Sequence, residues 1–340
     1  MLRWGLFMCL WLGAALGAMQ PREKWPQIIS HRGACGYVPE HSLHAYKLAM
    51  DLGTDYIEPD LCLSKDGVFV VMHDITLDET TDIMDHTEFA DRSNEGHFYV
   101  ADFTVDELKV LRLKQRLSSR TTLYDGLFTI PTFSEVIDLV WSNYNSTGYT
   151  IGIYPELKQP SYHNALGFEM SMEEMLVAQL EEGGYEVHGV SNNLTMQVHP
   201  VVIQCFEEES LISLSSLTDI PLLQLVGSSV KWTEDTLESI AEYAHGVGPD
   251  KSIFTDVPLE DARDMAMLAH ELELAIHPYT FRQESSSVAS QFNGDAQAEA
   301  AYFYCCLGVD ATFAEFTDHM RETLDELLMD PTSVCAMASC

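Results

Sequence analysis

Short apolar runs alternate along most of the chain with longer amphipathic stretches. The runs are typical of buried strands in a parallel sheet, and the stretches of about ten to fifteen residues are typical of the helices between them. The expected strands are QIIS, DYIEPDL, VFVVMH, YTIGIYPEL, VVIQCF, PLLQLV, the stretch near AHGVGP, LELAIHPYT and, as a closing strand, GVDATFAEF. The expected helices are residues 41–52, 133–142, 170–183, 233–245, 259–272, 296–306 and 318–329. Such repeated βα units indicate the α/β class and are enough for a closed (β/α)8 TIM barrel.

The alternation stops at residues 75–130, where polar segments such as TDIMDHTEFADRSNEGH precede a possible short helix at residues 104–113. A loop of that length without secondary structure is uncommon in a compact domain. We therefore predict a barrel over residues 27–329 with a small inserted subdomain, residues 75–130, after its third strand. The hydrophilic residues 330–340 are expected to form a loosely held C-terminal tail.

The chain begins with an apolar run, WGLFMCLWLGAALGA, that ends in small residues. This pattern predicts a signal peptide over residues 1–18, cleaved near Gly17 or Ala18. An uncleaved membrane anchor is the alternative, because the run contains bulky aromatic residues. No later stretch is long and apolar enough to span a bilayer. We therefore expect a secreted, periplasmic or secretory-pathway protein with no stable membrane span after cleavage.

Acidic residues outnumber basic ones by 53 to 18, which gives a formal net charge of -35. This excess would repel a polyphosphate backbone, so nucleic acid is not an expected partner. The charge is scattered along the chain, which favours a strongly solvated surface over a dedicated cation-binding tail.

Eight cysteines are present, one of them within the predicted signal peptide. An exported protein can form disulfides. Cys335 with Cys340 is one candidate pair, and Cys305 and Cys306 with distant partners are others. The sequence leaves the connectivity open.

Polar side chains cluster where the expected strands end. In DYIEPDL, Glu58 and Asp60 are two residues apart, and the period of a strand places both on one face. Pro59 is tolerable only near a strand terminus, so the pair is expected at the carboxyl end, where α/β barrels bind their substrates. Taken alone, the pair is weak evidence and favours a solvated strand end over a metal site.

The expected strand YTIGIYPELK ends in a similar way, with Glu156 and Lys158 two residues apart. Alone they could be an ion pair at the rim of the barrel. Together with Glu58 and Asp60 they supply a third carboxylate and a counter-charge for an anion. Three carboxylates completed by water and substrate oxygens suit Ca²⁺ or Mg²⁺ rather than a softer metal.

Two further expected strands end in histidine. QIISHRG ends with His31 and Arg32, and VFVVMHD ends with His73. Imidazole is the side chain whose ordinary pKa is closest to neutrality, so two histidines can serve as a general acid and a general base. A single histidine is usually a surface or core residue, but here four expected strand ends carry compatible chemistry.

Those stretches together resemble the glycerophosphodiester phosphodiesterase family. The match runs through HRGACGYVPEH, DYIEPDLCLSKDGVFVVMHD and YPELK, and continues in IQCF, YAHGVGPD and HPYTFR. It extends from about Ile28 to Asp318 and is most similar to the periplasmic bacterial branch that carries a long insertion. The ordered set of motifs is far more specific than any one of them.

The resemblance implies a β/α barrel enzyme that hydrolyses glycerophosphodiesters, such as glycerophosphocholine, to glycerol 3-phosphate and an alcohol with a divalent cation as cofactor. The residues at the matching motif positions are the acid/base histidines His31 and His73, the metal ligands Glu58, Asp60 and Glu156, the phosphate contacts Arg32 and Lys158, and the pocket residues Gln204, Phe206 and Tyr279. One departure lies in ATFAEFTD, where Glu315 replaces the aspartate of the family and Thr317 its proline, so no role is carried over to Glu315.

The mechanism that we expect begins with attack on phosphorus by the substrate's own glycerol 2-hydroxyl, activated by the metal. One histidine removes the hydroxyl proton and the other protonates the departing alcohol, and water then opens a cyclic glycerol phosphate. Two alternatives stay open: a phospholipase C- or D-like enzyme acting on intact lipid, and a non-catalytic exported binding protein. The preferred alcohol, the choice between Ca²⁺ and Mg²⁺, the order of the histidines and the oligomeric state are not predicted.

Overall fold

The computed structural model describes residues 26–190 and 200–338. The predicted signal peptide, residues 1–18, therefore lies outside the described residues. Within them, no helix combines the length and the apolar character that crossing a membrane requires.

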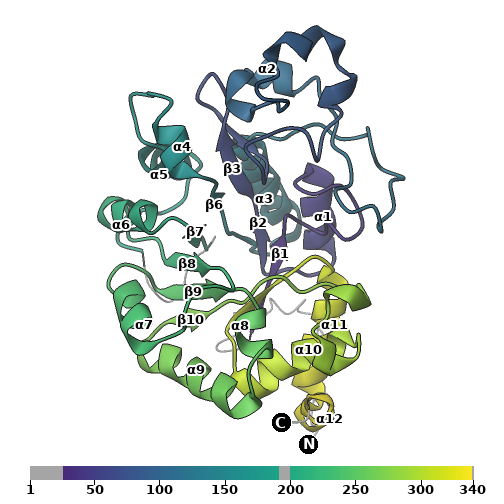
Figure 1. Cartoon of the computed structure of the whole chain (residues 1–340), viewed down its shortest axis with the longest axis vertical. Helices are drawn as coiled ribbons and strands as arrows, with labels where there is room; N and C mark the ends of the chain where they lie inside the picture. The colour runs from purple at the N-terminus through teal and green to yellow at the C-terminus, as the bar shows by residue number, and fades with distance from the viewer. Residues whose placement is uncertain (1–25, 191–199, 339–340) are drawn as a thin grey trace, which may run out of the picture.

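Parallel strands form a closed barrel at the centre of the molecule (Figure 1). In chain order the strands are β1 (Gln27–His31), β2 (Tyr56–Glu58), β3 (Asp60–Leu63), β4 (Phe69–Val71), β5 (Gly152–Ile153), β6 (Glu156–Leu157), β7 (Ile203–Cys205), β8 (Leu222–Val226), β9 (Gly246–Pro249), β10 (Ala275–Ile276) and β11 (Ala311–Ala314). One sheet has the order β11-β1-β2-β5 and the other β10-β9-β8-β7-β6-β3-β4. They are joined because β2 continues into β3 and β5 into β6, and because a bridge from Phe281 to Ala314 closes the ring. The predicted α/β barrel is confirmed.

Helices surround the barrel, and seven of the twelve in the described residues begin at a Ser, Thr or Asp whose side chain caps the first turn. They are α1 (Leu43–Asp51), α2 (Val105–Leu108), α3 (Phe133–Thr147), α4 (Pro160–Asn164), α5 (Met172–Glu182), α6 (Glu208–Leu217), α7 (Glu234–Ala241), α8 (Ser252–Thr255), α9 (Leu259–Glu271), α10 (Ala296–Ala301), α11 (Thr317–Met329) and α12 (Pro331–Met337). Thr132 and Glu135 form a capping box at the start of α3, which satisfies two of the backbone N–H groups that a helix start leaves unpaired. Gly148 ends the same helix with a φ of 73°, a conformation that a residue without a Cβ adopts at no steric cost.

The strand VFVVMH is not a barrel strand, contrary to our prediction. Its core, β4, pairs with β3 in an antiparallel hairpin, with Leu61 opposite Val71. Only a short turn through Asp66 and Gly67 joins the two strands, whereas a parallel neighbour needs a crossover of a dozen or more residues. Residues 75–130 therefore lie between the second and third parallel positions of the barrel, and not after the third.

Side chains of neighbouring residues in a strand pack on opposite faces of the barrel wall. Ile28 belongs to the large cluster between strands and helices, and Ile29 belongs to a cluster inside the barrel. The inner cluster also contains Tyr56, Tyr154 and Phe313, so the lower part of the barrel is a packed core rather than a channel. The polar residues of the strand ends lie above this core.

Residues 75–130 pack around a hydrophobic cluster of their own, at the top of Figure 1 near α2. Phe103, Leu111 and Val100 are fully or almost fully buried there, together with Cys62 and Met72 from the β3–β4 hairpin and its end. Three short 3₁₀ helices, η1 (Ile83–Asp85), η2 (Thr87–Arg92) and η3 (Val100–Asp102), contribute one residue each to the cluster, and most of its other members lie in the connecting segments. The inserted segment is thus seated on the hairpin that follows the second barrel strand.

Most of the predicted loose tail is folded. Residues 331–337 form α12, and Val334 is buried. A disulfide joins Cys335 to Cys305, which belongs to the π-helix η7 (Tyr302–Leu307) after α10. The candidate pairing of Cys335 with Cys340 is therefore wrong, and Cys305 has the distant partner that was the other possibility.

Candidate active site

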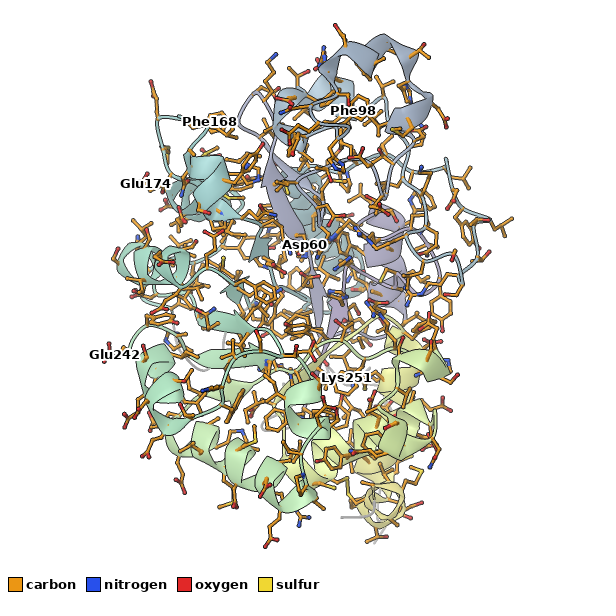
Figure 2. All side chains as sticks on the ribbon, viewed as in Figure 1. Asp60, Phe98, Phe168, Glu174, Glu242 and Lys251 are labelled. Atoms are coloured by element: carbon orange, nitrogen blue, oxygen red, sulfur yellow. A yellow bond between two sulfur atoms is a disulfide. The ribbon has the colours of Figure 1, made fainter. Side chains whose placement is uncertain are left out.

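Three buried carboxylates lie side by side on the second and third barrel strands, which are neighbours in the barrel wall. Glu58 ends β2, Asp60 begins β3 and Glu156 begins β6, and Asp60 is paired with Glu156 in register. Their side-chain oxygens lie within 4.8 Å of one another, and the residues are 0%, 1% and 6% exposed. Asp60 lies at the centre of the molecule in Figure 2, whereas Glu174 and Glu242 lie at its periphery. The structure thus brings together the three residues that the sequence identified as metal ligands.

Two cations and an amide border this cluster. The Lys158 Nζ lies 2.6 Å from a Glu156 oxygen and 3.9 Å from Asp60 Oδ1, and the Arg32 Nε lies 3.5 Å from Asp60 Oδ2. The backbone N–H of Arg32 donates to Glu58 Oε2 at 2.8 Å, and the Gln204 amide donates to Glu58 Oε1 at 3.1 Å. Each carboxylate is therefore oriented by at least one donor.

The electrostatics of the cluster favour a divalent cation. Burial and the neighbouring carboxylates raise the pKa of Glu58 well above its usual range, and burial raises the pKa of Glu156 to about 8 despite Lys158. Burial opposes ionisation of Asp60 too, but Lys158 and His41 outweigh it and hold that pKa low. Asp60 Oδ1 is buried and accepts no hydrogen bond from any described residue. A group of closely spaced carboxylate oxygens, one of which has no hydrogen-bond donor, is the kind of ligand set that Ca²⁺ and Mg²⁺ prefer.

The two histidines face the same cavity, each backed by a carboxylate. His31 Nδ1 lies 3.0 Å from Glu315 Oε1, and His73 Nδ1 lies 2.6 Å from Asp74 Oδ1. Burial lowers the pKa of His31 to about 4 and also lowers the pKa of His73. Burial therefore favours the neutral form of both rings before an anionic substrate binds, and a Nδ1–H donated to the carboxylate leaves Nε2 free to accept a proton.

His73 is carried by an element that the sequence did not predict. It follows β4, the antiparallel strand of the hairpin, so three barrel positions and one hairpin end supply the site instead of four barrel strands. The antiparallel pairing of β3 with β4 continues by one residue, where the backbone N–H of Met72 donates to the Asp60 carbonyl at 3.0 Å. This bond brings the histidine beside the carboxylates.

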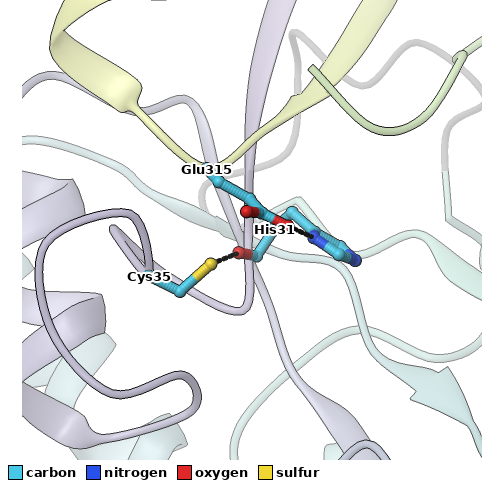
Figure 3. A group of neighbouring side chains, drawn as sticks. All are labelled: His31, Cys35 and Glu315. Atoms are coloured by element: carbon cyan, nitrogen blue, oxygen red, sulfur yellow. Dashed lines mark hydrogen bonds and ion pairs between the residues drawn. The ribbon is translucent and has the colours of Figure 1, made fainter. Parts of the chain in front are cut away.

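Figure 3 shows a second group of potential metal ligands, His31, Cys35 and Glu315. The Cys35 thiol donates to the His31 carbonyl at 3.2 Å, and burial raises its pKa well above the usual range, so it stays a thiol. Arg120 and Arg282 both pair with Glu315, and two guanidinium groups would repel a cation there. This group is a hydrogen-bonded support for His31 rather than a metal site.

Several supporting residues were missed by the sequence reasoning. His41 Nε2 lies 2.8 Å from Asp60 Oδ2, and the buried Glu40 pairs with Arg32 at 3.1 Å and with Arg116 at 2.9 Å. Both follow the His31-Arg32 motif in HRGACGYVPEH, and that proximity was the available signal. Glu315 had none, because it departs from the pattern of the family.

A cavity of about 510 Å³ opens above the carboxylates. The predicted site residues that line it are His31, Arg32, His73, Glu156, Lys158, Gln204, Phe206 and Tyr279. Lys251, Asp250 and Arg282 line it as well and were not predicted. Glu58 and Asp60 do not line it, because both are buried behind its wall.

A second cavity, of about 570 Å³, adjoins the first. The two share His73, Glu156, Lys158 and Phe206. The second extends between β6, β7 and the start of the inserted segment, where Asp78 and His97 line it. The histidine, the lysine and one carboxylate of the cluster, Glu156, thus lie between two chambers, which suits a substrate with groups on both sides of a reacting centre.

Comparison with known proteins identifies the family. Residues 31–319 match the model of the "Glycerophosphoryl diester phosphodiesterase family". A glycerophosphodiester phosphodiesterase of Arabidopsis thaliana is 37% identical over 324 residues, which cover 87% of this chain and 85% of the relative. The glycerophosphodiester phosphodiesterase of Haemophilus influenzae is 29% identical over 300 residues, 76% of this chain and 79% of that protein.

Solved structures share the fold. A glycerophosphodiester phosphodiesterase from Agrobacterium tumefaciens aligns with a TM-score of 0.58 at 19% identity and covers 88% of this chain and 100% of that chain. A phosphodiesterase from Oleispira antarctica, solved in complex with the product sn-glycerol-3-phosphate, aligns with a TM-score of 0.58 at 22% identity, covering 88% of this chain and 97% of that chain. At these identities the likeness shows the barrel and nothing finer.

Proposed function

The chain belongs to the glycerophosphoryl diester phosphodiesterase family and is an enzyme with glycerophosphodiester phosphodiesterase activity, and we propose that it works with a divalent cation and two histidines. The observation that carries the proposal is the convergence of three buried carboxylates, two histidines and two cationic side chains around one cavity. The charges are arranged for a phosphodiester: cations for its oxygens and acid/base groups for the proton transfers.

Glu58, Asp60 and Glu156 would hold the cation, which we propose is Ca²⁺ or Mg²⁺. When bound, it supplies positive charge to a phosphoryl oxygen and stabilises the charge that builds up during displacement at phosphorus. Lys158 and Arg32 reach the same region and would contact the other oxygens, where preorganised cations stabilise a transition state.

For the reaction we propose attack by the glycerol 2-hydroxyl on phosphorus. A bond forms between that oxygen and phosphorus while the bond from phosphorus to the head-group oxygen breaks. One histidine, in its neutral form, accepts the hydroxyl proton at Nε2. The other takes up a proton from solvent once the substrate anion lies beside it, and gives that proton to the departing alcohol. Water then opens the cyclic phosphate with the two histidines in reversed roles, which returns both rings to their starting state. The carboxylates behind His31 and His73 support this cycle, because each stabilises an imidazolium when it forms.

The products and the 2-hydroxyl requirement test this function together. Glycerophosphocholine should yield sn-glycerol 3-phosphate and choline, with a cyclic phosphate detectable early by ³¹P NMR. The analogue that lacks the 2-hydroxyl should be hydrolysed at least about 10²-fold more slowly, and His31→Ala should lose on the order of 10² to 10⁴ in rate. Equal turnover of the deoxy analogue would rule out the cyclic route, and phosphocholine as product would mean cleavage of the wrong bond.

We further propose that the preferred substrates carry a cationic head group, as glycerophosphocholine does. The lining of the first cavity has four permanent cations, Arg32, Lys158, Lys251 and Arg282, against two carboxylates, Glu156 and Asp250. The second has five carboxylates, Asp74, Asp78, Glu79, Glu156 and Glu207, against two permanent cations, Arg116 and Lys158. The first therefore suits glycerol phosphate and the second a positively charged alcohol, which the Phe206 ring could also contact through its face.

Head-group preference is measurable by direct competition. Glycerophosphocholine should have a kcat/KM roughly three- to tenfold above that of glycerophosphoglycerol, a difference of about 1 kcal/mol. Asp78→Asn should reduce the ratio of the two kcat/KM values, because it removes a negative charge that lines only the second cavity. A neutral head group that competes equally well in the parent protein would contradict the assignment.

A further inference from the structure

Both catalytic histidines depend on a carboxylate that lies outside the substrate-binding lining of the first cavity. Glu315, at the end of β11, accepts from His31 Nδ1, and Asp74, next to His73, accepts from His73 Nδ1. A carboxylate in this position fixes the tautomer and the orientation of the ring. Whatever holds the two carboxylates therefore holds the two histidines.

Two arginines from one short loop of the inserted segment hold them. Arg120 donates through Nη2 to Glu315, through Nε to Glu284 at 2.7 Å and through Nη1 to the Cys35 carbonyl at 3.1 Å. Its side chain is only 5% exposed. The guanidinium therefore joins the inserted segment to the first strand's loop and to the last barrel strand.

Arg116, four residues earlier, makes the corresponding contact with Asp74, the carboxylate beside the other histidine. Its Nη2 lies 2.7 Å from Asp74 Oδ2 and 2.9 Å from Glu40 Oε1, and its Nε lies 3.0 Å from Glu40 Oε2. Asp74 thus shares its two oxygens between His73 and Arg116. The planar, always charged guanidinium holds both carboxylates in a fixed geometry, whereas the donors of a lysine share one nitrogen and impose no plane.

We propose that Arg116 and Arg120 are positioning residues, each for one histidine, so that the inserted segment sets the geometry of the acid/base pair. This inference rests on the roles proposed above for His31 and His73. Arg120 lines neither cavity, so it acts through Glu315 and not by touching the substrate. Arg116 lines only the second cavity and reaches His73 through Asp74.

The proposal is tested by Arg120→Gln and Arg116→Gln, with Arg120→Lys and Arg116→Lys as conservative partners. Each glutamine variant should lower kcat by roughly 10- to 100-fold, the usual loss when an outer partner of a catalytic ligand is removed. The affinity for sn-glycerol 3-phosphate, which has no head group, should change by less than about twofold in both variants. KM for glycerophosphocholine should change by less than about twofold in Arg120→Gln, because Arg120 lines neither cavity, and lysine should restore part of kcat. A loss confined to KM would overturn the proposal, because it would mean a direct substrate contact.

Arg92→Gln is the matched control. Arg92 lies in the same segment and pairs with Glu107, away from both cavities, so its loss removes a charge without touching either histidine. Its kcat should equal that of the parent. If Arg120→Gln and Arg116→Gln lose no more activity than Arg92→Gln at matched thermal stability, the two arginines only hold the inserted segment in place and the proposal is wrong.

Double variants assign each arginine to its histidine. In a His31→Ala background, Arg120→Gln should cause no further loss while Arg116→Gln keeps its effect, and in a His73→Ala background the pattern should reverse. Residues that act through one another are non-additive in this way, whereas independent ones add. Full additivity in both backgrounds would overturn the proposal.

A readout without turnover separates this inference from the proposed function. In ¹⁵N-histidine NMR spectra of the parent, His31 should show the Nδ1–H tautomer, and Arg120→Gln should produce a mixture of tautomers. An unaltered spectrum would sink the inference even if the protein is an active phosphodiesterase. A parent protein with no phosphodiesterase activity would instead defeat the proposed function, while the spectrum would still decide whether Arg120 orders His31.

Discussion

At the scale of single residues, the carboxylate cluster proposed to hold the metal depends on side chains that are not themselves proposed ligands. His41 has a φ of 61°, is 1% exposed and bridges Asp60 to the Tyr46 hydroxyl with contacts of 2.8 and 2.7 Å. Tyr46 in turn donates to the Glu58 carbonyl at 3.2 Å. A residue kept in a left-handed conformation and wholly buried between two ligand segments fixes where the ligands point.

We predict that His41→Ala weakens the affinity for the activating cation by about 10- to 100-fold, because Asp60 loses its orienting partner. Isothermal titration of metal-free protein, with activity followed against free metal concentration, measures this directly. His44→Ala is the control, since His44 stacks on Phe128 and makes no described contact with the carboxylates. Equal metal affinity in both variants would show that Asp60 needs no support from His41.

The sequence predicted the site residues that occur at fixed spacing after apolar runs. It did not predict the residues that hydrogen-bond to them from distant parts of the chain. His31, Glu58, Asp60 and Glu156 were found because each follows an apolar run at a strand end. Arg116 and Arg120 carry no such signal, since the segment around them has no regular periodicity and their partners lie far away in sequence. Glu315 was visible only as a departure from a motif, and its contact with His31 appears once β11 closes the barrel beside β1.

At the scale of elements, hydrophobic periodicity predicted the barrel but not the hairpin. A parallel strand buried on both faces reads as a continuous apolar run, and so does β4, so composition alone does not separate them. The distinguishing signal was the Asp66-Gly67 dipeptide between two apolar runs, a common hairpin turn. Gly67 has a φ of 72°, which this turn requires. The strand count was therefore one too high.

Helix α4 carries an element-scale prediction on pH. His163 is fully buried, and neither ring nitrogen has a hydrogen-bond partner among the described residues. Burial lowers its pKa from 6.5 to about 4. Between those values the unfolded chain binds more protons than the folded one, so the contribution of His163 to stability falls as the pH is lowered from 6.5 towards 4.

His163→Leu removes this titration. As the pH is lowered from about 6.5 to 4, the unfolding free energy of the variant should rise relative to that of the parent by roughly 1.4 kcal/mol for each pH unit. This change is independent of any constant difference in stability between the two proteins at pH 7.5. Urea unfolding at pH 7.5, 6.0 and 5.0 gives the difference. Parallel pH curves for the two proteins would mean that His163 is protonated as easily in the folded state as in the unfolded chain.

At the scale of the whole molecule, a protein with a net charge of -35 binds an anion because charge is distributed unevenly. The chamber proposed for glycerol phosphate gathers permanent cations around one face of the carboxylate cluster, and the acidic excess lies in the neighbouring chamber and on the solvated surface. The inserted segment contributes to this arrangement from outside the barrel. Its own hydrophobic cluster makes it a stable platform for the loop that carries Arg116 and Arg120.

The central claim is that three buried carboxylates hold a divalent cation on which hydrolysis depends. The most direct test is release of sn-glycerol 3-phosphate from glycerophosphocholine by chelated protein, before and after addition of Ca²⁺ or Mg²⁺, in the parent and in Asp60→Asn. The parent should be inactive after chelation and recover with added metal, and Asp60→Asn should stay inactive at metal concentrations that saturate the parent. Full activity in the chelated parent would contradict the account.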